Sequence, residues 1–204
     1  EAFRKLAAQA DVLLESYRPG VMKKLGLDYE TLKEINPRLI YCSISAYGQE
    51  GPYANRPGYD VIAQAVSGMM EMTGEPDGPP NKIGSAIGDW MGALNAFGCI
   101  GTALYYRSET GEGQHIDISL ARSLMWMAAK LDHGITGEMQ TRTGNHHSNL
   151  APYGIFKGRN NQSVVIGVLS SKLWETFCKV IQRTELINDP RFAPAGVLAP
   201  KSKA

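Results

Sequence analysis

One acidic residue, Asp89, separates a loop of small residues from a long uncharged stretch of the chain. The loop is Gly84-Ser85-Ala86-Ile87-Gly88, and no charged residue occurs from Trp90 to Tyr106. A carboxylate in this position can cap the following helix, because its oxygen accepts hydrogen bonds from amides in the first turn. It can equally serve as a nucleophile toward an electrophilic carbonyl. The residues around Asp89 leave both interpretations open.

The uncharged stretch after Asp89 has the composition of a helix that other elements approach closely. Its small residues are Gly92, Ala93, Ala96, Gly98, Gly101 and Ala103. We expect a buried helix over residues 90–106, ended by Arg107 and the turn at residues 110–113. Apolar and polar residues then alternate over residues 116–120, which predicts a half-buried strand.

The first part of the chain predicts a parallel β-α-β unit. Residues 12–14 and 39–45 are apolar runs typical of buried strands, and a helix from Asp28 to Asn36 lies between them. The turn at residues 15–20 follows the first strand, where open α/β sheets bind ligands. A further helix is expected over residues 59–72. No GxGxxG motif occurs, which argues against a nicotinamide or flavin site.

Composition excludes several classes of protein. The 204 residues carry a formal net charge of +1, which argues against a nucleic-acid or anionic-membrane partner. No apolar run is long enough to span a membrane. Cys42, Cys99 and Cys178 lie in apolar stretches and predict reduced core residues in a cytoplasmic protein. No CxxC or HExxH pattern occurs, so we expect no metal.

Several stretches together resemble a known family. They are ESYRPG at residues 15–20, NPRLIYCSISAYGQEGPY at 36–53, GYDVIAQAVSGMMEMTG at 58–74, IGD at 87–89, TGEGQHIDISL at 110–120 and GNHHSNLAPYGIF at 144–156. In this order they resemble the class III coenzyme A transferases, the formyl-CoA transferase or CaiB/BaiF family.

The resemblance implies a particular organisation. Residues 1–120 would belong to a large Rossmann-like domain that binds coenzyme A, residues 121–143 to a helical linker, and residues 144–204 to the start of a small α+β domain. Members of this family form interlocked homodimers. The chain begins without Met and ends without a periodic pattern. We therefore expect it to be the middle of a longer protein, and a mitochondrial location stays open.

The resemblance also implies a reaction. Asp89 would attack an acyl-CoA, and coenzyme A would pass through an aspartyl thioester to a free carboxylic acid, with a small dicarboxylate favoured as the acid. Neither a metal nor another cofactor is needed. The positions matching those that contact CoA or line the site are Ser16, Tyr17, Lys24, Leu25, Tyr59 and Asp60. Arg18 could bind CoA or hold its own loop, and Asp60 could instead cap a helix or form a salt bridge. Asn145 and His147, in a polar loop, could cover the site and donate hydrogen bonds, or belong to a solvated turn.

Two alternatives remain from the sequence. Acyl-CoA racemases of the same superfamily use the histidine of a GHD motif as an acid or base. Here the triplet is Gly58-Tyr59-Asp60, and a tyrosine with a pKa of about 10 is a poor base near neutral pH. The missing histidine disfavours this activity. The second alternative is a truncated, non-catalytic relative.

Overall fold

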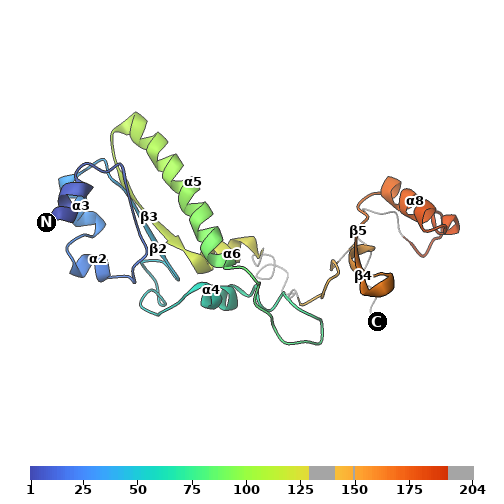
Figure 1. Cartoon of the computed structure of the whole chain (residues 1–204). Coiled ribbons are helices and arrows are strands. Elements are labelled where there is room, and N and C mark those ends of the chain that lie inside the picture. Colours follow the sequence, from blue (N-terminus) through green and yellow to red (C-terminus); the bar gives the residue numbers. More distant parts are fainter. Residues whose placement is uncertain (129–140, 149, 193–204) are drawn as a thin grey trace. The chain divides into compact units, whose positions relative to one another are not determined.

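The computed structural model describes residues 1–128, 141–148 and 150–192 (Figure 1). The chain forms two compact units. The first comprises residues 1–73 and 80–140, and the second comprises residues 74–79 and 141–204. The boundaries expected at residues 120 and 143 remain predictions.

A parallel sheet forms the centre of the first unit. Its strands, in spatial order, are β1 (Val12–Glu15), β2 (Ile40–Ser45) and β3 (Gln114–Ser119). Val12 pairs with Ile40, and Ile40 pairs in turn with Gln114. The crossover between β1 and β2 contains α3 (Tyr29–Ile35). The predicted parallel β-α-β unit is therefore confirmed, and the unit has the α/β class that we expected.

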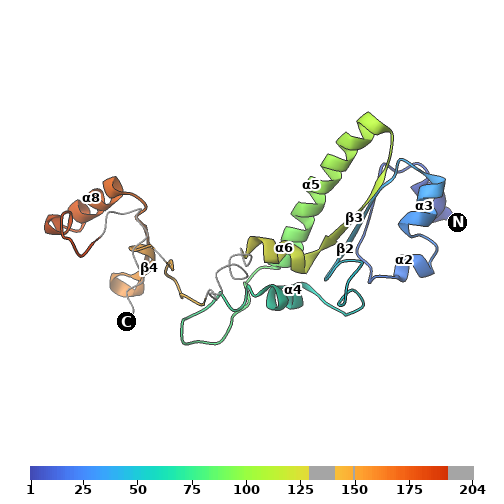
Figure 2. The same ribbon diagram turned by 180° about the vertical axis from the view of Figure 1, so that it is seen from behind.

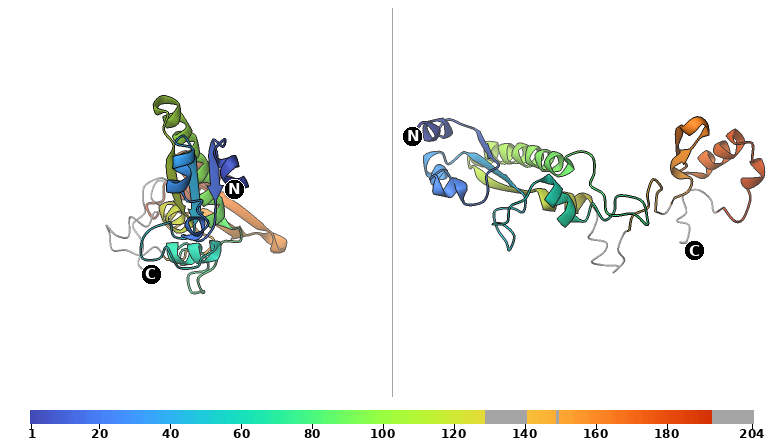
Figure 3. Two further views of the ribbon diagram at one scale, coloured as in Figure 1. Left: turned by 90° about the vertical axis from the view of Figure 1, so that its left-hand side faces the viewer. Right: turned by 60° about the horizontal axis from the view of Figure 1, so that its bottom comes forward.

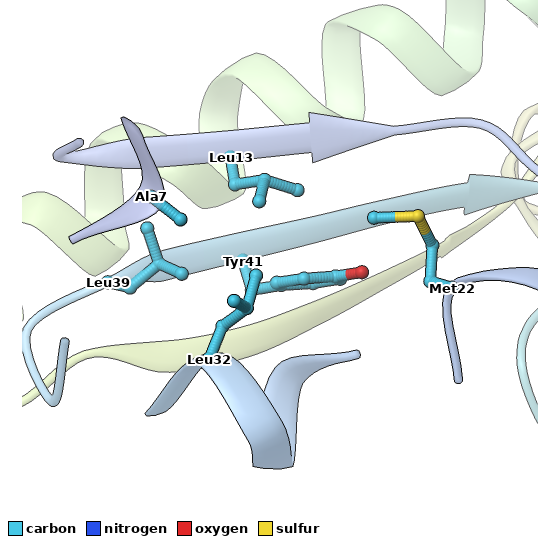
Figure 4. Close-up of a cluster of buried hydrophobic side chains, with 6 residues drawn as sticks. All are labelled: Ala7, Leu13, Met22, Leu32, Leu39 and Tyr41. Atoms are coloured by element: carbon cyan, nitrogen blue, oxygen red, sulfur yellow. The ribbon is translucent and has the colours of Figure 1, made fainter. Parts of the chain in front are cut away.

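Three short helices cover one face of the sheet: α1 (Ala2–Ala7), α2 (Val21–Lys24) and α3. The core on this side contains Ala7, Leu13, Met22, Leu32, Leu39 and Tyr41 (Figure 4). Tyr41 is almost fully buried, and its hydroxyl donates a hydrogen bond of 3.1 Å to the carbonyl of Leu27. The buried phenol therefore keeps a partner for its one polar group.

The long helix α5 (Ile87–Thr110) covers the opposite face, as the views in Figures 2 and 3 also show. Its buried residues are small: Gly92, Ala96 and Ala103 lie toward the sheet, and Gly88 lies against Ala63 and Leu124. A Cβ atom at Gly92 would lie only 2.5 Å from Leu120 Cδ2. Small residues are thus required here because the helix lies directly on its neighbours.

The expectation of a buried helix holds for only one face of α5. Its outer face is exposed at Trp90, Leu94, Phe97 and Tyr105. Cys99 is also exposed, whereas Cys42 and Cys178 are buried, so the expected core location fails for Cys99. Absence of charge identified the helix, but only one of its faces packs on the sheet, where Ile100 and Leu104 join the small residues.

Two further helices lie beside α5. They are α4 (Asp60–Ser67) and α6 (Leu120–Met127), and both contact α5 and one another. The helix expected over residues 59–72 is shorter than predicted, because Gly68 adopts a left-handed conformation with φ of 80° and ends α4. The linker helix expected over residues 121–143 begins in α6, and residues 129–140 lie outside the described residues.

The second unit has mixed structure. A hairpin of β4 (Tyr153–Lys157) and β5 (Ser163–Gly167) encloses the 3-10 turn η1 (Arg159–Asn161). Helix α8 (Ser171–Val180) follows, capped by Ser170, and the turn η2 (Thr184–Leu186) comes after it. Among the helices that the structure describes, none has both the length and the apolar character needed to cross a bilayer.

Candidate active site

Asp89 lies in the first turn of α5, at the edge of the sheet where the parallel strands end. A tight turn joins the end of α5 to the start of β3, so the helix runs antiparallel to the strands. The Gly92 position lies beside Ile44, near the end of β2, and beside Leu120, directly after β3. The carboxyl edge of such a sheet is where ligands bind in open α/β folds.

Asp89 does not cap α5, contrary to one of our two interpretations. The residue before the helix is Ala86, and Asp89 is the third residue of the helix. The capping group comes instead from α4. Asp60 Oδ1 accepts a hydrogen bond of 2.6 Å from the backbone amide of Gly88. An oxygen supplied from another helix satisfies this first-turn amide, so α5 can begin before Asp89.

The side chain of Asp89 is available for chemistry. The residue is exposed, and no hydrogen bond joins its carboxylate to another residue within the described ranges. Although the residue is exposed, the protein atoms around part of its side chain keep some water away from the carboxylate. This partial burial raises the pKa of Asp89 above the ordinary value, and the nearby carboxylate of Asp60 raises that pKa further. A carboxylate with a raised pKa is more basic and therefore a better nucleophile, provided that it is ionised.

The segment before Asp89 is held by a residue that the sequence analysis did not select. Gln64, in α4, is fully buried and donates a hydrogen bond of 2.7 Å from Nε2 to Asp60 Oδ2. Its position four residues after Asp60 would have allowed this contact to be predicted, since such residues are neighbours on a helix. The contacts of Gln64 with the loop could not be read from spacing.

The turn after β1 presents Ser16, Tyr17 and Arg18 to solvent at the same edge of the sheet. The buried carboxylate of Glu15 fixes the turn, because it accepts a hydrogen bond of 2.8 Å from the amide of Tyr17. Arg18 donates a hydrogen bond of 3.0 Å to the carbonyl of Asn55. Arg18 therefore holds two loops together, and its contact with CoA stays a prediction.

Three other predicted residues are exposed in the first unit. Lys24 and Leu25 lie at the end of α2, where Leu25 is 58% exposed, and Tyr59 directly precedes α4 and is 79% exposed. An exposed cation next to an exposed apolar side chain, as at Lys24 and Leu25, suits a phosphorylated nucleotide. Their roles in binding remain predictions.

Asn145 and His147 belong to the second unit, in the loop before β4. The backbone of β4 holds this loop. The amide of Ile155 donates to the carbonyl of Asn145, and the amide of His147 donates to the carbonyl of Tyr153; each hydrogen bond is 3.0 Å long. The ring of His147 also contacts that of Tyr153. Both predicted donors are exposed in an ordered turn, and their part in catalysis remains a prediction.

No group of three His, Cys, Asp or Glu side chains that could hold a metal ion occurs among the described residues. The reaction without a metal is an expectation from the resemblance, and it remains one.

Comparison with known families shows the class of protein to which this chain belongs. CoA-transferase family III matches residues 1–199, and the chain belongs to this family. An acetyl-CoA:oxalate CoA-transferase from Acetobacter aceti is 44% identical over 93% of this chain and 49% of its own length. The succinyl-CoA:glutarate CoA-transferase of Homo sapiens is 38% identical over 93% of this chain and 43% of its own.

Solved structures give the same result. A CaiB/BaiF family protein from Brucella suis aligns with a TM-score of 0.80 and 40% identity, covering 95% of this chain and 52% of that one. Rv3272 from Mycobacterium tuberculosis aligns with a TM-score of 0.80 and 30% identity, covering 93% and 49%. The chain thus spans about half the length of the relatives it matches.

Proposed function

We propose that the protein transfers coenzyme A between an acyl-CoA and a free carboxylic acid, with Asp89 as the nucleophile. The observation that carries the proposal is an exposed carboxylate of raised pKa in the first turn of α5, at the carboxyl edge of the sheet. Membership of CoA-transferase family III supports it. The turn after β1 and the end of α2 supply Arg18 and Lys24 as cations for the phosphates of CoA.

The reaction proceeds in balanced steps. An oxygen of Asp89 attacks the thioester carbonyl, the C–S bond breaks, and a mixed anhydride and CoA thiolate form. The thiolate attacks the aspartyl carbonyl and releases the donor acid as a carboxylate. The product of this step on the enzyme is an aspartyl thioester. The acceptor carboxylate attacks this thioester, the C–S bond breaks, and a second mixed anhydride and CoA thiolate form. The thiolate then attacks the acceptor's carbonyl, and the carboxylate of Asp89 is the leaving group. The new acyl-CoA leaves, and Asp89 is regenerated with the thioester energy conserved.

The oxyanions that form in these steps need hydrogen-bond donors. Asn145 and His147 are our candidates. For the acid we propose a small dicarboxylate, since relatives are named for oxalate, mesaconate and glutarate. An interlocked homodimer and a cytoplasmic location complete the proposal.

The test is to trap the intermediate in the full-length protein. After incubation with succinyl-CoA, hydroxylamine or borohydride should modify Asp89, and peptide mass spectrometry locates the change. Asp89→Asn should abolish both the adduct and CoA exchange. The matched control is Glu109→Gln, which removes an exposed carboxylate in the last turn of the same helix. CoA exchange that persists in Asp89→Asn, or α-proton exchange with deuterated water without CoA transfer, would contradict the proposal.

A further inference from the structure

Gln64 is the most completely buried polar side chain near Asp89. Its exposed fraction is 0%, and it is one of the largest side chains that the first unit encloses fully. Burying a carboxamide destabilises a protein unless its donors and acceptor are satisfied. An apolar residue of similar size would fill the same space without this requirement. The contacts that Gln64 makes therefore need a physical explanation.

Those contacts join α4 to the segment that leads into α5. Gln64 Oε1 accepts a hydrogen bond of 2.9 Å from the amide of Ile83. Its Nε2 donates to the carbonyl of Ser85 at 3.3 Å and to Asp60 Oδ2 at 2.7 Å. The amide orientation follows from this pattern, because the backbone amide of Ile83 can only donate and the carbonyl of Ser85 can only accept.

Asp60 adds one more hydrogen bond between α4 and this segment. Its Oδ2 receives the Gln64 donor, and its Oδ1 accepts from the amide of Gly88. The segment of residues 83–88 is thus attached to α4 at residues 83, 85 and 88. We call Asp60, Gln64 and these three attachment points the α4 clamp.

The end of the segment is also held by packing, because Ile87 lies against the cluster that contains Leu120 and Leu124 and Gly88 is buried, whereas residues 83–86 are exposed or only partly buried. The segment contains two glycines, and a Cβ atom at Gly84 would meet nothing within 4 Å. Asp89 follows the last attachment point directly, and its own carboxylate has no hydrogen-bond partner within the described ranges. The packing of α5 on the sheet and on α6 fixes the axis of the helix, and the clamp fixes the backbone that leads into its first turn; the direction in which Asp89 points depends on both.

We propose that Gln64 is a positioning residue for the reaction of Asp89: through Asp60 and residues 83–88 it fixes the start of α5, and it touches no substrate itself. This inference rests on the CoA-transfer function proposed above. A misplacement of about 1 Å at a reacting group can lower a rate by roughly 10²-fold. Loss of the clamp should therefore lower kcat while leaving KM for the acyl-CoA within about twofold.

The test compares three variants of the full-length protein. Gln64→Met keeps the volume and loses all three hydrogen bonds. Gln64→Glu keeps the acceptor for Ile83 and loses the donor to Asp60 and to Ser85. Ser67→Ala is the matched control, because Ser67 is also buried in α4. Among the described residues its hydroxyl bonds only to the carbonyl of Gln64 and the amide of Met69. Single-turnover formation of the Asp89 adduct, KM and Tm are measured for each.

The expected result is adduct formation about 10- to 100-fold slower in both Gln64 variants, with Ser67→Ala close to wild type. Hydrogen exchange at the amides of Ile83 and Gly88 should also be faster in Gln64→Met than in Ser67→Ala. A wild-type rate in Gln64→Met, or unchanged protection of both amides, overturns this inference alone. A wild-type protein that forms no Asp89 adduct overturns the proposed function and the positioning role with it.

Discussion

The carboxylate of Asp60 lies 2.6 Å from the backbone amide of Gly88, the residue immediately before Asp89. This bond links α4 to α5 and holds two carboxylates at the start of one helix. Its consequence is electrostatic as well as structural, because the charge of Asp60 adds to the effect of partial burial on the pKa of Asp89. The residue that caps the helix and the residue that we propose as nucleophile are therefore different.

The first prediction concerns that electrostatic coupling. Asp60→Asn removes a negative charge that disfavours ionisation of Asp89, and its amide oxygen can still accept from Gly88. Its amide nitrogen cannot accept from Gln64 Nε2, so the clamp is weakened and each pH profile is normalised to its own plateau. The pKa of Asp89 should fall but stay above the ordinary value, since burial is the larger cause. Titration of the Asp89 carboxyl carbon by NMR measures the shift, and the acidic limb of adduct formation should move to lower pH. An unchanged or higher pKa would contradict the coupling.

The second prediction concerns the close approach of α5 to α4 at Gly88. A Cβ atom at Gly88 would lie 2.9 Å from Asp60 Oδ1 and 3.3 Å from Leu124 Cδ1. Gly88→Ala should push the Asp60 carboxylate away and slow adduct formation, by roughly tenfold if the displacement is a fraction of an ångström. Gly98→Ala, on the open side of the same helix, is the control. Equal activity in the two variants would show that the Asp60 contact does not matter.

A third prediction tests the contact of α5 with its neighbours. Gly92→Ala places a Cβ atom 2.5 Å from Leu120 Cδ2, so the core must shift. We expect a loss of about 1–3 kcal/mol in the free energy of unfolding, typical of overpacking. Gly101→Ala has no atom within 4 Å and should instead stabilise the helix, by about 1 kcal/mol. Urea denaturation of both variants gives the comparison, and a stable Gly92→Ala would refute the close packing.

The fourth prediction separates structure from binding at the two candidate cations. Lys24→Gln removes only an exposed charge, so KM for the acyl-CoA should rise, by up to about tenfold, with Tm unchanged. Arg18→Gln also removes the hydrogen bond to the carbonyl of Asn55, so Tm should fall as well. Steady-state kinetics at two salt concentrations and calorimetry provide the measurements. A KM that neither variant changes would remove both residues from the CoA site.

Local sequence was sufficient for the three strands of the first unit and for α3 and α5. Apolar runs identified β1 and β2, and the helix between them predicted their parallel pairing. The uncharged stretch after Asp89 identified α5, and alternation identified β3. Each of these inferences depends on neighbours in the chain, because periodicity and short connections are local properties.

Tertiary structure alone decided how Asp89 is presented. The sequence allowed Asp89 to be the helix cap, but an oxygen from Asp60, 28 residues before Gly88, took that position. Gln64 held the preceding segment from the same helix, and half of α5 remained exposed despite its uncharged sequence. Spacing along the chain determines which residues share a helix face, but contacts between distant segments depend on how the helices come together around the sheet.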